Sequence, residues 1–249
     1  MTALALLGLV AAGFTAGVVG YVTGLASIVS YPALLAFGLS PLSANVTNTV
    51  ALVASGVGSF AKSGRDLTAG DGGRSLATSS LVALAGGAVG AALLLTAPDD
   101  TFSAIVPYLV ALAAIALLVQ PYLRRLLDRG GDSPRWWIVA VFVVSIYGGY
   151  FGAGAGVIFL ALAMLLTSLP LWHSVLLKSA LLGVANAVAA VAFLIFGPVD
   201  PAAAAAMGIG CFLGGWTGPP IVARLPAEPL RIAIGVCGLG LAVWLGVSG

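Results

Sequence analysis

The stretch Gly148-Gly149-Tyr150-Phe151-Gly152-Ala153-Gly154-Ala155-Gly156 lies in the middle of an uncharged run from Trp136 to Leu169. An earlier run, from Ala3 to Phe37, is built in the same way. The spacing Gly-x-x-Gly-x-x-x-Gly occurs at positions 17, 20 and 24 and again at 149, 152 and 156, and each pair differs by 132 positions. This repetition predicts two copies of one unit, each organised around a glycine centre.

Both glycine-centred runs are longer than one ordinary membrane crossing requires. A helix rises about 1.5 Å per residue and the hydrocarbon core is about 30 Å thick, so about 20 residues are enough. The length favours a helical hairpin or broken helix whose arms meet at the glycines. The alternative is one long tilted helix, in which glycines three and four apart let a neighbouring helix approach closely.

Composition places the chain among polytopic membrane proteins. Of its 249 residues, 61% are hydrophobic and 7% are charged, and the mean hydropathy is +1.15. A soluble domain needs more charge to cover its surface, and the apolar runs do not alternate as barrel strands do. The net charge of +2 is too small to indicate a nucleic-acid partner. We therefore expect an all-α protein whose main partners are the lipid bilayer and a small molecule, with a homo-oligomer left open.

The chain divides into two membrane repeats joined by a polar linker. We predict the first repeat at 1–123, a linker loop at 124–135 and the second repeat at 136–249. After its glycine run, each repeat has three further apolar spans. They lie at 43–60, 75–97 and 102–123 in the first repeat, and at 174–196, 202–218 and 232–247 in the second.

The basic residues set the expected orientation. The loops 62–74, 124–135 and 219–231 hold nine of the ten Lys and Arg residues, whereas the turns at 98–101 and 197–201 hold none. The positive-inside rule then places these three loops in the cytoplasm and both termini outside. Between the 124–135 loop inside and the 197–201 turn outside lie the second glycine run and one ordinary span. The second glycine run must therefore cross an even number of times, which again favours a hairpin.

The same topology makes the two repeats inverted. The span at 43–60 runs inward across the membrane, while its counterpart at 174–196 runs outward. Inverted repeats are typical of secondary transporters, whose substrates bind near the midplane where discontinuous helices meet. The fold class that we predict is two inverted repeats, each opening with a glycine-centred helical hairpin or broken helix.

Lys178 is the only charged residue that this reading places within a span. A charge at the centre of a membrane helix costs about 2.5 to 3.5 kcal/mol on insertion scales, so it needs a reason. One interpretation is an ammonium group that faces a cavity and binds an anion. The alternative is a side chain that reaches back to the nearby membrane interface.

A second polar cluster opens the span at 43–60. Asn45 and Asn48 lie three apart on one helix face, followed by Thr49, and the 132-residue offset puts them at a depth matching that of Lys178. Their amides are candidate donors to an oxyanion, or else make interhelical contacts. His173, the sole histidine, is a further candidate at the turn before Lys178, with an ordinary interfacial histidine as the alternative.

The glycine breaks supply the remaining candidates. Helix N-termini at Gly20, Gly24, Gly152 and Gly156 would offer backbone N–H groups to an anion. All eight acidic residues fall in predicted loops or turns, so no ion site built from buried carboxylates is indicated. Paired acids and facing Ser–His pairs are also missing, and Cys211 and Cys237 are isolated. We expect no enzyme activity, no metal and no cofactor.

With these residues in view, the chain resembles the TauE/SafE family of sulfite exporters and anion permeases over almost its whole length. The resemblance rests on these motifs: Gly17-Val-Val-Gly-Tyr-Val-Thr-Gly24, Tyr31-Pro32-Ala-Leu-Leu-Ala-Phe-Gly38, Ala44-Asn-Val-Thr-Asn48, the glycines from 149 to 156, and Phe196-Gly-Pro-Val-Asp200. One departure is Thr23-Gly-Leu-Ala-Ser27, where the family has a denser glycine run. The resemblance implies transport of sulfite, sulfoacetate or other organosulfonates across the cytoplasmic membrane. An anion channel is the alternative function.

Overall fold

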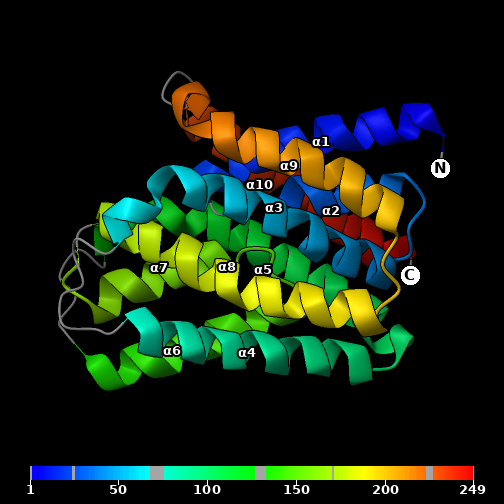
Figure 1. Cartoon of the computed structure of the whole chain (residues 1–249). Coiled ribbons are helices and arrows are strands. Elements are labelled where there is room, and N and C mark those ends of the chain that lie inside the picture. The colour runs from blue at the N-terminus through cyan, green and yellow to red at the C-terminus, as the bar shows by residue number, and fades with distance from the viewer. Residues whose placement is uncertain are drawn as a thin grey trace.

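The computed structural model describes residues 2–23, 26–67, 76–126, 133–169, 171–222 and 227–248. The regular structure in these ranges is entirely helical, and the helices run roughly along one common direction (Figure 1). In chain order they are α1 (Ala3–Thr23), α2 (Ser27–Ala36), α3 (Pro41–Leu67), α4 (Leu76–Thr96), α5 (Asp99–Leu126), α6 (Pro134–Tyr150), α7 (Ala155–Leu166), α8 (Leu171–Phe196), α9 (Pro201–Val222) and α10 (Ala227–Ser248). The all-α prediction is confirmed.

Both glycine-centred runs are broken helices. In the second run, Gly152 and Gly154 separate α6 from α7 with φ angles of 77° and 82°. This left-handed backbone is accessible to glycine and strained for other residues, so the helix ends here. The Tyr147 hydroxyl donates a 2.5 Å hydrogen bond to the Ala153 carbonyl and closes the turn. One long tilted helix is therefore wrong for this run.

The first run is divided between α1 and α2. Residues 24 and 25, including the predicted site residue Gly24, lie outside the described part. A methyl group added at Gly20 would come 2.6 Å from the Ala26 Cβ, so the chain folds back closely here. The second arms, α2 and α7, have 10 and 12 residues, or about 15 and 18 Å, and are too short to cross a bilayer alone.

Several helices extend further into the polar segments than we predicted. α3 continues to Leu67, α5 to Leu126 and α9 to Val222, while α10 begins at Ala227. The turn before Lys178, where we placed His173, is instead the first turn of α8, which begins at Leu171. The hydropathy of the sequence indicates only where a helix leaves the hydrocarbon core of the membrane. The helix itself continues beyond that point, because polar side chains can be solvated there while the backbone stays helical.

The helix ends divide into two sets (Figure 1). The C-terminal ends of α3, α5 and α9 lie at one end of the molecule, on the left in this view. The connections α4–α5 and α8–α9 lie at the other end, together with the start of α1 and the end of α10. The described helix ends that lead into the three basic segments therefore lie at the same end. Which end faces the cytoplasm stays a prediction.

The outer helices pack across the two halves through glycines. α1 packs on α9, where a methyl group at Gly17 would come 2.6 Å from the Cys211 carbonyl oxygen. α6 packs on α4 in the same manner, with Gly149 against the Gly87 backbone. Gly17 and Gly149 are the corresponding glycines of the two motifs. Close packing of small residues thus explains the first glycine of each motif.

The central helices α3 and α8 contact each other and run in opposite directions. The Ser43 hydroxyl, at the start of α3, donates a 2.8 Å hydrogen bond to the Pro198 carbonyl just after α8 ends. The Asp200 amide donates a 3.0 Å bond to the Thr47 hydroxyl, and the Asp200 carboxylate accepts from the Ala203 amide and caps α9. The start of α3 is therefore tied to the α8–α9 turn.

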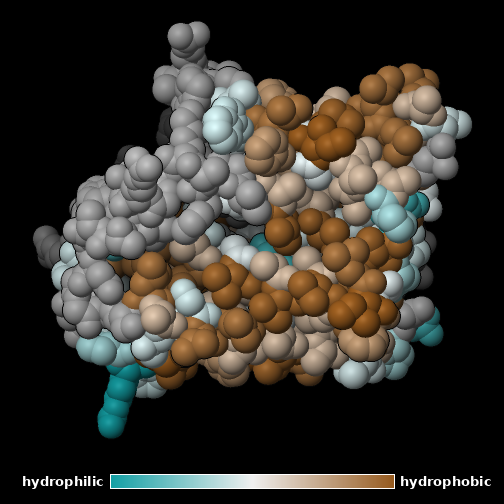
Figure 2. All heavy atoms as spheres, viewed as in Figure 1, coloured by the Kyte–Doolittle hydropathy of each residue, from teal (hydrophilic) through white to brown (hydrophobic). Residues whose placement is uncertain are grey.

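The surface is that of a membrane protein. Large apolar side chains such as Tyr108, Phe196 and Val247 are exposed, and hydrophobic residues dominate the face shown in Figure 2. Within the described residues, four helical segments are long and apolar enough to cross a membrane: Ala3–Gly20, Leu76–Thr96, Asp100–Val119 and His173–Phe196. Water could not solvate so much exposed apolar surface without aggregation, whereas lipid does.

Candidate functional site

A cavity of about 610 Å³ lies where the two helix breaks meet. Its walls come from five places: the α1–α2 break, α3, the start of α4, the α6–α7 break and α8. The residues from the two breaks are Gly20, Ala26, Ser27, Phe151, Gly152, Ala155 and Gly156. The two glycine centres, which are 132 residues apart in sequence, therefore form one site.

Two helix N-termini border this cavity. Ser27 opens α2 and Ala155 opens α7, and both line it. The first N–H groups of a helix have no partner within that helix and carry a partial positive charge. Such ends attract anions. The break in each run thus brings a positive helix end into the interior of the protein.

Lys178 lines the same cavity. Its side chain is 4% exposed, so it does not extend to the surface, as the interfacial alternative would require. It belongs to α8, whose residues Ser179, Leu182, Gly183 and Asn186 also line the cavity. The described residues that line the cavity include no Asp or Glu. Lys178 and the two helix N-termini bring positive groups to the wall of the cavity.

Of the predicted polar cluster on α3, only Thr49 lines the cavity. Its hydroxyl donates to the Asn45 carbonyl of its own helix at 3.1 Å. Asn45 and Asn48 are buried and bond to the breaks: the Asn45 Nδ2 donates to the Tyr150 carbonyl at 2.9 Å, and the Asn48 Nδ2 donates to the Ser27 hydroxyl at 3.1 Å. The asparagines stand behind the cavity wall and tie α3 to both breaks.

The other predicted residues divide in the same way. Gly20, Gly152 and Gly156 line the cavity, and their role in substrate binding stays a prediction. His173 is 3% exposed and lies in the first turn of α8, away from the cavity lining. A role for His173 in substrate binding stays a prediction.

Sequence reasoning did not single out Asn186, Ser27, Ser55 or Ser80, which also line the cavity. Asn186 follows Lys178 by eight residues, so both lie on one face of α8, about 12 Å apart along its axis. A polar residue at this spacing within an apolar span was a usable signal. A methyl group at Gly148 would lie 4.0 Å from the Asn186 Oδ1, so Asn186 adjoins the α6–α7 break. The cavity therefore has polar groups at two positions along α8, at Lys178 and at Asn186.

Among the described residues, no group of three or more His, Cys, Asp or Glu side chains is placed to hold a metal ion. The chemistry of the site lies in its ammonium, hydroxyls, amide and helix ends. Such groups are able to bind and orient an anion. Neither a nucleophile paired with a base nor a pair of carboxylates lines the cavity in the part of the chain that the structure describes.

Comparison with known proteins agrees with this architecture. The chain is 26% identical over 238 residues to the "Probable membrane transporter protein ORF9" of Sinorhizobium sp, covering 94% of this chain and 89% of that protein. The profile of the family described as "Sulfite exporter TauE/SafE" matches residues 9–245. With a match over nearly its whole length, the chain belongs to the TauE/SafE family of membrane transporters.

Proposed function

We propose that the protein is a secondary transporter that moves small sulfur-containing anions, such as sulfite, sulfoacetate or other organosulfonates, across the cytoplasmic membrane by alternating access. The observation that carries this proposal is the shared cavity, where Lys178 and the N-termini of α2 and α7 meet. Sites between discontinuous helices are typical of secondary transporters. Family membership supports transport in general.

The charge and size of the cavity favour an organic anion or oxyanion. Lys178 supplies a full positive charge, and Thr49 and Asn186 supply hydrogen-bonding groups. Most other lining side chains are apolar, including Leu52, Phe151 and Leu182. A volume of about 610 Å³ is typical of pockets for small organic ligands. An organosulfonate would place its anionic group at the positive groups and its carbon atoms against the apolar wall.

Alternating access is supported by the packing of helices from one half against helices from the other. α1 packs on α9 and α6 packs on α4, so the outer helices of each half lie against the broken helix of the other. The antiparallel arrangement of α3 and α8 is the one that inverted repeats require. Movement of one helix pair against the central pair would open the cavity to one side at a time.

Counterflow separates this proposal from an anion channel. Purified protein would be reconstituted into liposomes loaded with unlabelled sulfite or sulfoacetate and then given a trace of labelled anion. A transporter gives transient, saturable accumulation of label, because exchange occurs through one binding site. Leakage without saturable exchange would show a channel instead, and no anion movement at all would refute the proposed function.

The orientation is a separate prediction. We expect the loops at 62–74, 124–135 and 219–231 in the cytoplasm and both chain termini outside, because basic residues are retained inside. Single cysteines would be added at each terminus of a variant in which Cys211 and Cys237 are replaced by serine. A membrane-impermeant maleimide should label both ends on intact cells. Labelling of one end alone would contradict the inverted-repeat arrangement.

A further inference from the structure

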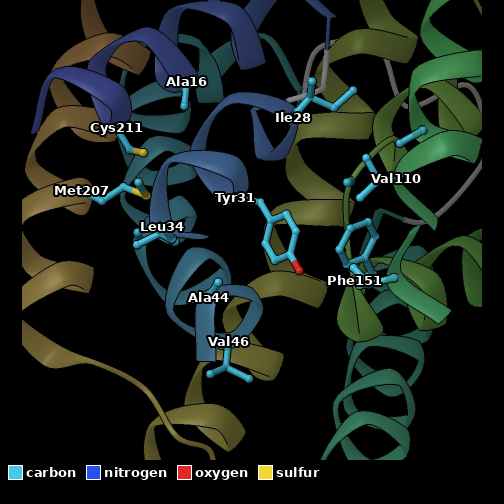
Figure 3. Packing of buried hydrophobic residues seen from close by; sticks show 14 of the residues in the cluster. Ala16, Ile28, Tyr31, Leu34, Ala44, Val46, Val110, Phe151, Met207 and Cys211 are labelled. Atoms are coloured by element: carbon cyan, nitrogen blue, oxygen red, sulfur yellow. The ribbon is translucent and has the colours of Figure 1, made fainter. Parts of the chain in front are cut away.

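Six residues form a ring of contacts behind the cavity. Asn45 donates to the Tyr150 carbonyl, and the next residue, Phe151, meets Tyr31 edge to face with ring centroids 5.6 Å apart. Figure 3 shows the Tyr31 ring directed from α2 toward Phe151. Tyr31 follows Ser27 by one turn of α2, and Ser27 accepts from Asn48, one turn from Asn45 on α3. The ring joins α2, α3 and the α6–α7 break.

Three oxygen atoms of this ring have unused hydrogen-bonding capacity. The Tyr31 hydroxyl, the Asn45 Oδ1 and the Asn48 Oδ1 are buried, and within the described structure none has a hydrogen-bond partner. Their residues are 1%, 0% and 1% exposed. A buried polar atom without a partner is uncommon and indicates a bound water or ion. Because the ring links all three residues through Ser27, Tyr150 and Phe151, we infer one bound species rather than three separate defects.

The electrostatics of the ring suit a cation. Two of the three oxygens belong to amides and are acceptors only. The ring also includes the C-terminal end of α6, where helix carbonyls lack partners within the helix and carry a partial negative charge. The ring contains no carboxylate, so a divalent ion would be poorly compensated. A monovalent ion held by neutral oxygens is the better match, and unwound helix ends hold such ions in secondary transporters.

We propose that Tyr31, Asn45 and Asn48 form a site for Na⁺ that is coupled to anion binding in the adjoining cavity. The proposal rests on the proposed transport function. Ser27 links the two sites, because it accepts from Asn48 and also lines the cavity. An anion beside Lys178 supplies the negative charge that the cation site lacks, so each ion favours the other. By linkage, Na⁺ strengthens anion binding and the anion strengthens Na⁺ binding by the same factor.

The first test measures Na⁺ binding without any substrate. Thermal unfolding of the purified protein would be followed in NaCl, KCl and choline chloride at equal ionic strength. We expect NaCl alone to raise the midpoint of the wild type by about 3 °C. Tyr31→Phe keeps the ring contact with Phe151 and removes one ligand oxygen. It should lose the NaCl effect, yet unfold no earlier than wild type in choline chloride, because it also removes an unpartnered buried hydroxyl.

A matched control is Ser145→Ala. Ser145 is buried on α6 and its hydroxyl also has no hydrogen-bond partner in the described structure, but it lies outside the ring. This variant should respond to NaCl as the wild type does. Asn48→Ala is a second ring variant and should lose the response as Tyr31→Phe does. If Ser145→Ala also lost the stabilisation by NaCl, the loss would reflect a general change in packing. That result would overturn the proposed cation site.

The second test measures coupling by calorimetric titration with sulfite and with sulfoacetate. We expect binding about tenfold tighter in NaCl than in choline chloride for the wild type, and equal binding in the two salts for Tyr31→Phe. If NaCl stabilises the wild type but no anion binds in either salt, the proposed function fails and the cation site stands. If anions bind equally in both salts and NaCl acts no more than KCl or choline chloride, the cation site is refuted, and a buried water satisfies the three oxygens.

Discussion

α3 and α8 are the two long central helices, each following the broken helix of its own half, yet they use their polar side chains differently. On α3, Asn45, Thr47 and Asn48 bond to other parts of the protein. On α8, Lys178 and Asn186 face the cavity. Helices in corresponding positions have thus taken separate tasks: α3 holds the two breaks together, and α8 supplies the charge. Both helices line the cavity, but its charged side chain comes from α8 alone among the described residues.

The largest effect is expected where the second break is destroyed. Gly152→Leu places a bulky residue at a φ of 77°, beside the Gly148 carbonyl, so the positive end of α7 should be lost from the cavity. We expect transport in proteoliposomes to be abolished while the protein still inserts. The control is Gly148→Ala, whose added methyl would meet only ordinary contacts, at 3.6 Å or more. Near-normal transport by Gly152→Leu would show that transport does not depend on the α6–α7 break.

Lys178→Met tests the task assigned to α8. Methionine keeps the length and apolar stem of lysine and removes the charge. Loss of a charge-assisted hydrogen bond should weaken sulfite or sulfoacetate binding by about 1.5 to 3 kcal/mol, or roughly tenfold to a hundredfold. Calorimetric titration of the two proteins in the same salt measures the difference. An unchanged affinity would show that α8 does not carry the anion-binding charge.

Two glycines allow the two walls of the cavity to be compared directly. Gly56 on α3 and Gly183 on α8 both line the cavity, and a Cβ at either would meet no atom within 4 Å. Gly183→Leu would place its side chain between Lys178 and Asn186, and we expect it to weaken anion binding by more than about tenfold. Gly56→Leu should weaken binding by less, about threefold. Equal losses would mean that the ligand contacts both walls alike.

Gly240→Leu is the control for this pair. Gly240 is exposed on α10, outside the cavity lining, and a Cβ there also meets no atom within 4 Å. The variant therefore tests the general effect of adding leucine to an open helix position. Its anion affinity should equal that of the wild type.

The smallest effect concerns the task assigned to α3. Asn45→Ala removes the hydrogen bond to the Tyr150 carbonyl, and interhelical hydrogen bonds in membranes contribute about 0.6 to 1.7 kcal/mol. The thermal midpoint should fall by about 2 to 4 °C, while anion affinity in choline chloride stays within about twofold of wild type. Thr96→Ala is a control, since Thr96 is exposed and bonds only within its own helix. A large loss of affinity in Asn45→Ala would make Asn45 a direct ligand.

Lys178 and the glycine breaks could be identified from the sequence because each violates a strong local rule. A charge in an apolar run is costly, and a glycine cluster interrupts a helix that is too long for one crossing. The sequence identified the asparagines as polar residues within a span. It did not indicate which atoms their amides bind. Their partners, Tyr150 and Ser27, are 105 and 21 residues away, and no local pattern indicates them. Asn186 was missed because a single neutral amide in an apolar helix becomes a signal only when its spacing from Lys178 is also considered.

The sequence by itself determined that the chain is an all-helical membrane protein with two glycine-centred runs, because hydropathy, helix length and glycine spacing act along the chain. It also determined where the helices break, since glycine alone readily adopts the backbone found at Gly152 and Gly154. Only the tertiary structure decided that both breaks share one cavity, that α1 packs on α9 and α6 on α4, and that α3 ties the breaks while α8 lines the site. These features depend on packing between segments that are separated in the sequence, by 21 residues for Asn48 and Ser27 and by 105 for Asn45 and Tyr150. Small shifts in helix rotation then decide whether a side chain faces the cavity, lipid or protein.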